Sequence, residues 1–219
     1  MKRILRHRGV LALAVAGLAA ALTACGPDSP SASSTSSKTT AGASGSAAGT
    51  SAAADTPFGP GCATVPASGP GSFTDMAAAP VVTAASGNPA LKSFVQALTT
   101  ANLVDSLNTT PELTVLIPAD PAFAAVPADQ LKALMADVPR LTSTLLHHVI
   151  QGRLTPDRLA GTHTTLNNDA VTIAGSGTHF AVAGGGTVVG TAASVTCGDV
   201  RTSNATVYVI DQVLKPTGS

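Results

Sequence analysis

The chain has 219 residues, of which 44% are hydrophobic, 3% aromatic and 11% charged, which suits one good-sized domain with a long tail. Its 12 Lys and Arg residues balance 12 Asp and Glu residues, so the chain lacks the basic surplus expected of a nucleic-acid binder. The shortage of aromatic residues also argues against a platform for stacking bases. We therefore expect no nucleic-acid partner.

The N-terminus has the layout of a targeting segment. Residues 2–8 include four Lys or Arg residues, and residues 9–22 form a largely apolar run. This pattern predicts a secretory signal peptide over residues 1–24, because the run is shorter than the about 20 apolar residues of a spanning helix. If the first eight residues are removed, eight basic residues face twelve acidic ones, so the mature chain is mildly acidic.

The signal peptide ends at a cysteine. Residues 22–26 read Leu-Thr-Ala-Cys-Gly and resemble the bacterial lipobox, in which the cysteine becomes the lipidated first residue of the mature chain. We expect Cys25 to carry the lipid and to hold the protein at the outer side of the membrane, on the cell surface. The alternative is an ordinary cleavage site with a chance cysteine, and a shed form stays open.

A spacer is expected to follow the lipidation site. Residues 28–57 contain 25 Ser, Ala, Thr or Gly residues among 30, with no Val, Leu, Ile, Phe or Met. Such a segment cannot bury apolar surface, so residues 25–60 are predicted to form a disordered tether. Whether sugars are attached to it is left open.

Residues 61–219 are predicted to form one folded domain of the α+β class. Helices are expected at Asn88-Pro89 and Asp120-Pro121, with Asn88 and Asp120 as their N-caps, at Pro127 and after Pro139, and a buried strand is expected over residues 113–117. Short β-branched runs separated by turn residues follow at 171–173, 180–182, 188–189, 195 and 207–210. Helices therefore come first and antiparallel strands last, and the early strand must rejoin the later ones.

Two cysteines remain for the domain, Cys62 and Cys197. An exported protein meets an oxidising compartment, so we expect these two residues to form a disulfide. A metal site is the weaker interpretation, because the chain has no CxxC pair.

No compact catalytic motif is present, and we expect a protein that is not an enzyme and has no cofactor or metal. His147 and His148 are adjacent, so they cannot point the same way on a regular helix or strand and make a poor chelating pair. A hydrolase site assembled by the fold from His148, Asp211 and a serine stays open. Asn108 and Asn204 begin glycosylation sequons, for which chance is the better explanation.

Three segments carry a resemblance to one family. Residues 114–123 (TVLIPADPAF), 145–152 (LLHHVIQG) and 204–216 (NATVYVIDQVLKP) resemble, in order and spacing, three signatures of the fasciclin domain. The resemblance covers about residues 72–216 and, with the lipobox and tether, extends to single-domain fasciclin lipoproteins and secreted antigens of mycobacteria and related bacteria. It implies a β-wedge of two small sheets flanked by helices, with a non-catalytic role in adhesion or in binding a surface or matrix protein.

One departure from the family pattern concerns its binding residues. His147 stands where the family usually has Tyr, in a Tyr-His dipeptide associated with adhesion in animal members, so His147 and His148 are the residues proposed for binding. His148 is also expected to be buried and structural. A large apolar pocket with converging polar groups would instead favour a hydrolase or a carrier of small molecules or lipids.

Overall fold

The computed structural model describes residues 56–217. The predicted signal peptide, Cys25 and nearly all of the predicted tether lie outside the described residues. The helices are α1 (Phe73–Ala78), α2 (Val81–Ser86), α3 (Lys92–Thr100), α4 (Val104–Thr109), α5 (Asp120–Ala124), α6 (Ala128–Ala136), α7 (Val138–His147) and α8 (Pro156–Leu159), with 3-10 turns η2 (Pro60–Thr64), η3 (Pro89–Leu91) and η4 (Gly184–Gly186). The strands are β1 (Leu113–Pro118), β2 (Val149–Gln151), β3 (Gly161–Thr164), β4 (Ala170–Ser176), β5 (His179–Val182), β6 (Ala193–Arg201) and β7 (Ala205–Ile210).

The strands follow the order β2-β1-β7-β6-β5-β4-β3. The early strand β1 lies between β2 and β7, and it pairs in parallel with β7 from Leu113–Ala205 to Pro118–Ile210. The other strand pairs are antiparallel. The predicted α+β class is confirmed, and the early strand rejoins the late ones.

The two expected small sheets are the two halves of this strand order, and they meet along β6. Ala193 and Ser194 of β6 pair with β5, whereas the residues from Val195 onward pair with β7. The pairing of β6 with β7 shifts register around Cys197, and such irregularities bend a strand. The two outer edges approach each other again through a bridge between Ile150 and Thr165, so the sheet is nearly closed.

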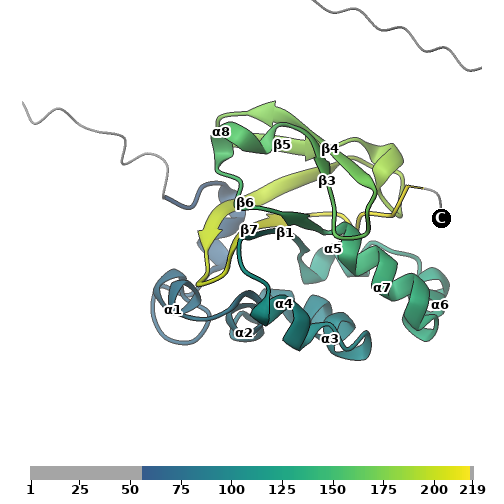
Figure 1. The fold of residues 1–219 in the computed structure, drawn as a ribbon, viewed down its shortest axis with the longest axis horizontal. Helices are drawn as coiled ribbons and strands as arrows, with labels where there is room; N and C mark the ends of the chain where they lie inside the picture. Colours follow the sequence, from purple (N-terminus) through teal and green to yellow (C-terminus); the bar gives the residue numbers. More distant parts are fainter. Residues whose placement is uncertain (1–55, 218–219) are drawn as a thin grey trace, which may run out of the picture. The chain divides into compact units, whose positions relative to one another are not determined.

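The part of the sheet that contains β1 and β7 separates two hydrophobic cores. Figure 1 shows α1 to α4 along one side of β1 and β7, and β3 to β5 on the other side. Side chains alternate along β1. Val115 and Ile117 therefore join the helical core, which lies between the sheet and the helices, and Leu116 joins the inner core, which lies between the two halves of the sheet. The same alternation on β7 sends Val207 to the helical core and Tyr208 to the inner core.

Several local expectations hold. The side chain of Asn88 accepts a hydrogen bond from the backbone N–H of Ala90 and caps η3, which leads directly into α3. Pro127 immediately precedes α6. The helix expected after Pro139 begins one residue earlier, at Val138, where the carboxylate of Asp137 accepts from the N–H of Arg140.

Two local expectations were wrong. Residues 188–189 form no strand; they lie in the loop between η4 and β6, where the N–H of Val188 donates to the carbonyl of Val213. Asp120 does not cap α5, since it is the first residue of that helix. Its carboxylate instead accepts from the N–H of Ser93 at 2.8 Å and ties α5 to the start of α3.

The entry of the chain is fastened to β6. Phe58 forms a bridge with Gly198 and packs its ring near those of Phe180 and Tyr208, so the fold begins before residue 61. A disulfide joins Cys62 to Cys197, as expected, with a Cα–Cα distance of 4.8 Å. The helical core and the N-terminal segment are thus covalently joined to the strand that links the two sheet halves.

Both sequon asparagines hold the helical layer in place. The side-chain carbonyl of Asn204 accepts from the N–H of Val81 at 2.8 Å, and its amide donates to the carbonyls of Leu107 and Thr110 at 2.7 and 2.8 Å. The side chain of Asn108 accepts from the N–H of Val82. These amides therefore serve hydrogen bonding within the domain.

Candidate binding site

His148 follows the last turn of α7 and is 1% exposed. Its Nδ1 lies 2.7 Å from the carbonyl oxygen of Thr144, and its Nε2 lies 3.0 Å from the backbone nitrogen of Leu214. Nδ1–H therefore donates to Thr144, and Nε2 accepts from Leu214, which requires a neutral ring. Burial lowers the pKa of His148 to about 4, although the Thr144 hydrogen bond opposes this shift.

His147 is the last residue of α7 and is also buried. Its Nδ1 lies 2.7 Å from Oδ1 of Asp169. The same carboxylate also accepts from Thr165 at Oδ1 and from Asn167 at Oδ2. Burial alone would raise the pKa of Asp169, but the hydrogen bonds from Thr165, His147 and Asn167 outweigh it and lower this pKa to about 2. Asp169 is thus a carboxylate that accepts from His147.

Both histidines hold the C-terminal segment against α7. His148 binds the backbone of Leu214, and Asp169, held by His147, accepts from the backbone N–H of Thr217 at 3.2 Å. Because both imidazoles are buried, the expected binding role of His147 and His148 has to be restated. The two side chains hold α7 and residues 215–217 in place, and their rings are too buried to contact a partner directly.

The structure does not assemble the hydrolase site that the sequence left open. Both ring nitrogens of His148 are engaged by backbone groups. The carboxylate of Asp211 accepts from the N–H of Ser194 at 2.7 Å, and His148 has no ring nitrogen left to bind it. Within residues 56–217 there is also no group of three or more His, Cys, Asp or Glu side chains that could hold a metal ion.

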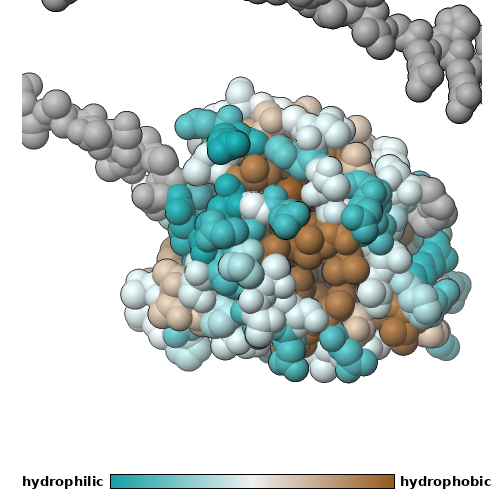
Figure 2. Space-filling model, in the orientation of Figure 1, coloured by the Kyte–Doolittle hydropathy of each residue, from teal (hydrophilic) through white to brown (hydrophobic). Residues whose placement is uncertain are grey.

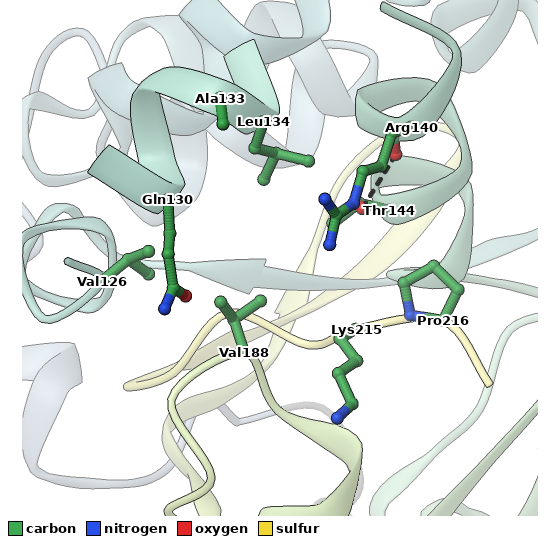
Figure 3. Close-up of a pocket in the computed structure, with 9 residues that line it drawn as sticks. All are labelled: Val126, Gln130, Ala133, Leu134, Arg140, Thr144, Val188, Lys215 and Pro216. Carbon is green, nitrogen blue, oxygen red and sulfur yellow. Dashed lines mark hydrogen bonds between the residues drawn. The ribbon is translucent and has the colours of Figure 1, made fainter. Parts of the chain in front are cut away.

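A pocket lies beside the surface that the histidines support. It has a volume of about 370 Å³ and is walled by α6, α7, the loop at Val188 and the segment Lys215–Pro216. Val126, Leu134 and Val188 give it an apolar lining (Figure 3). A pocket of this size and mixed lining is typical of sites for small ligands.

Two cations belong to this pocket. Figure 3 shows the guanidinium of Arg140 extending from α7 into the space, while Lys215, which also lines the pocket, points its ammonium group away from Arg140. Thr144, whose hydroxyl donates to the carbonyl of Arg140 at 2.9 Å, lines the same pocket and also receives the hydrogen bond of His148. The lining residues include no Asp or Glu, and the carboxylate of Asp137 lies just outside, where it accepts from the backbone N–H of Arg140 at 3.1 Å.

A second hollow is more apolar. It has a volume of about 290 Å³ and lies where the start of α5 meets η2, η3 and β6, with Val65, Leu91 and Val209 in its lining. Figure 2 shows hydrophobic residues gathered near the centre of one face of the domain, over the area of α5, with hydrophilic residues around them. A contiguous apolar area of this kind marks interaction surfaces in many proteins.

The comparison with known families decides the classification. The sequence profile of the fasciclin domain matches residues 89–216, which is more than half of the chain and includes β1, α7 and β7.

The chain belongs to the fasciclin domain family.

Named relatives share most of this fasciclin domain. The chain is 42% identical over 167 residues to proteins named cell surface glycolipoprotein MPB83 of Mycobacterium bovis and MPT83 of Mycobacterium tuberculosis, covering 73% of this chain and 72% of each relative. It is 40% identical over 166 residues to immunogenic protein MPB70 of Mycobacterium bovis, covering 72% of this chain and 81% of the relative.

A solved structure was also compared with this fasciclin domain. A FAS1 domain pair from the insect cell adhesion molecule fasciclin I aligns with a TM-score of 0.47 and 24% identity, over 58% of this chain and 45% of that chain. This likeness is too weak to add to the family assignment.

Sequence analysis missed the two residues that complete the site of this fasciclin domain. Asp169 lies in an Asn-Asn-Asp stretch typical of a turn, and nothing in that stretch indicates that its carboxylate fixes His147. Arg140 belongs to no sequence motif. It becomes part of a site only because the fold places Val188 and Lys215 in the lining of the same pocket. A strand break at residues 167–169 could have pointed to Asp169, whereas nothing local could have pointed to the pocket.

Proposed function

We propose that this protein is a lipid-anchored surface protein that displays one fasciclin domain and binds a partner protein or matrix component without catalysis. The observation that carries the proposal is the 42% identity to relatives named cell surface glycolipoproteins, together with a lipobox that ends at Cys25. Cys25 would carry the anchor, and residues 25–60 would extend the domain outward.

Two features of the domain favour binding over catalysis. The ring nitrogens of His148 are occupied by the backbone of Thr144 and Leu214, which leaves no free general base at the place where a hydrolase was considered. The apolar hollow lined by Val65, Leu91 and Val209 supplies a surface of the kind that protein partners cover.

Replacing Cys25 with Ala should release the protein from the membrane. The substitution removes the sulfur that would carry the lipid, and one folded domain without acyl chains has little membrane affinity. The measurement is fractionation of cells, together with mass spectrometry of the mature N-terminus of the unaltered protein. A matched Ser29→Ala variant should remain in the membrane fraction.

An unmodified Cys25 in the mature chain would contradict the anchor. Retention of the Cys25→Ala variant in the membrane fraction, at the level of Ser29→Ala, would have the same meaning. Neither result would bear on whether the domain binds a partner.

The released Cys25→Ala chain should bind a surface or matrix protein saturably, and Thr64→Arg should weaken that binding. Thr64 is exposed and lines the apolar hollow, so an arginine there would place a charge where apolar surface has to be buried. We expect a loss of roughly tenfold or more, equivalent to about 1.4 kcal/mol. Surface-plasmon measurements on purified envelope and matrix proteins would provide the affinities.

The control for this experiment is Thr99→Arg, on the exposed side of α3, which should leave the affinity unchanged. If Ser143→Arg weakens binding and Thr64→Arg does not, the partner meets the surface over His147 and His148 instead. A parallel panel of esterase, peptidase and glycosidase substrates tests the alternative function. Turnover that a single substitution abolishes, without any saturable protein ligand, would replace the binding proposal by an exported hydrolase.

A further inference from the structure

The pocket between α6 and α7 has two chemically different parts. Val126, Leu134 and Val188 form apolar lining, and Leu134 and Val126 are already buried by the fold. Arg140 projects its guanidinium into the space (Figure 3). At about 370 Å³ the volume lies at the lower end of the range for small-ligand pockets, roughly 300–1,000 Å³, so it suits one short chain better than a lipid with two.

The charge of this pocket is opposite to that of the domain around it. Residues 56–217 contain seven Lys or Arg residues and ten Asp or Glu residues, yet two of the seven cations line this pocket and no carboxylate does. Within residues 56–217, no ion pair is formed by the side chains of Arg140 or Lys215. Arg140 and Lys215 thus give the lining two positive charges outside any ion pair, with Asp137 as the neighbouring carboxylate, and two such charges favour an anion.

We propose that this pocket binds a single-chain anionic amphiphile, whose carboxylate or phosphate head meets Arg140 and whose alkyl chain lies along Val126, Leu134 and Val188. A guanidinium presents paired N–H donors that match both kinds of head group. Lys215, at the margin, adds a second positive charge that its flexible stem can bring to the head. This inference concerns a different surface from the apolar hollow and does not depend on the proposed protein partner.

The surrounding hydrogen bonds preorganise this site. Arg140 and Thr144 lie one turn apart on α7, and His148 binds the carbonyl of Thr144 and the N–H of Leu214. His148 thus holds the segment after β7 that carries Lys215 against the helix that carries Arg140. Preorganisation of both walls lowers the entropic cost of binding.

The test is calorimetric titration of the released Cys25→Ala chain with soluble ten-carbon probes. Decanoate and decyl phosphate should bind saturably with one site, whereas decanol should bind at least tenfold more weakly because it lacks the anionic head. Acetate and inorganic phosphate, which lack the chain, should give no measurable heat. If decanol binds as tightly as decanoate, the proposal is wrong about the head group, and if phosphate alone binds as tightly as decyl phosphate, it is wrong about the chain.

Substitutions separate this site from general charge effects. Arg140→Gln should weaken decanoate binding roughly fivefold, since exposed charge pairs contribute up to about a factor of five, and Lys215→Gln should weaken it less. Lys132→Gln is the matched control, because it removes one positive charge from the exposed side of α6 outside the pocket. Ala133→Phe should fill the pocket and abolish binding without changing the charge. Equal losses in Lys132→Gln and Arg140→Gln, or full binding by Ala133→Phe, would overturn the proposal.

Vesicles distinguish a free amphiphile from a membrane head group. Phosphatidylglycerol vesicles should fail to sediment the protein if the ligand is a free single-chain molecule. Sedimentation that Ala133→Phe prevents would assign the same pocket to a membrane lipid. Sedimentation that Ala133→Phe leaves unchanged, in the absence of decanoate binding, would contradict the site altogether.

Discussion

Replacing Cys62 and Cys197 together with Ser should lower the free energy of unfolding by about 2–5 kcal/mol, the usual cost of losing a native disulfide. The bond closes a loop with a sequence separation of 135 residues, for which the chain-entropy description gives about 4–5 kcal/mol as an upper figure. The new side chain at position 197 would also place a hydroxyl where the structure is 1% exposed. The corresponding fall in melting temperature is about 10 °C for a domain of this size.

Urea titration of the unaltered protein, the double variant and the reduced unaltered protein gives the free energies. The last two should both lie well below the oxidised protein, and the double variant should be the lower of the two because it also buries a hydroxyl at position 197. Peptide mapping without reductant should recover one linked pair containing Cys62 and Cys197. Free thiols at both positions in the native protein, or equal stability of all three samples, would show that the bond does not form or does not contribute.

Acidification between pH 6.5 and pH 4 should destabilise the domain, with His148 supplying about 3 kcal/mol of that loss. The pKa of His148 is about 4 in the folded protein, against 6.5 for an unperturbed histidine, and each pKa unit of difference corresponds to about 1.4 kcal/mol. In this range the unfolded chain binds a proton that the folded chain does not, so stability rises with pH. Above pH 6.5 the ring is neutral in both states, and below pH 4 it is protonated in both, so the contribution changes only between these limits.

The variant His148→Gln should flatten this dependence. Its stability is expected to be lower than that of the unaltered protein at pH 7, because Thr144 and Leu214 lose their shared partner, but to fall less between pH 6.5 and pH 4. The exposed His179 provides the matched control, and His179→Gln should keep the original slope. Asp169 acts in a lower window, since its pKa is about 2 and its stabilisation is lost only as the pH falls below about 4. Identical slopes in His148→Gln and the unaltered protein would contradict the assignment to His148.

Local patterns in the sequence predicted many elements of this domain. The cap at Asn88, the buried run at residues 113–117 and the helix after Pro127 each depend on a few neighbouring residues, which is why they could be read in advance. The prediction of a strand at residues 188–189 was wrong, because β-branched residues also occur in loops. This loop is held by the hydrogen bond from the N–H of Val188 to the carbonyl of Val213. Propensity alone does not separate a strand from a loop that packs against the core.

The candidate site depended on distant contacts and could not be read in this way. His147 and His148 were recognised by motif, but their burial and their shared hold on residues 214–217 follow from the pairing of β7 with β1. The pocket combines Arg140, Val188 and Lys215 from three separate parts of the chain. No periodicity links such positions, because each belongs to a different element.

The central position of β7 has a consequence for how this protein acquires its fold. β7 lies between β1 and β6 and completes both hydrophobic cores, although it is the last strand to leave the ribosome. A nascent chain that stops before Ala205 lacks the partner of β1 over six residue pairs, so neither core can close. Contacts so remote in sequence also make folding slow. The fold can therefore close only after synthesis has passed β7, an order that suits the export proposed above.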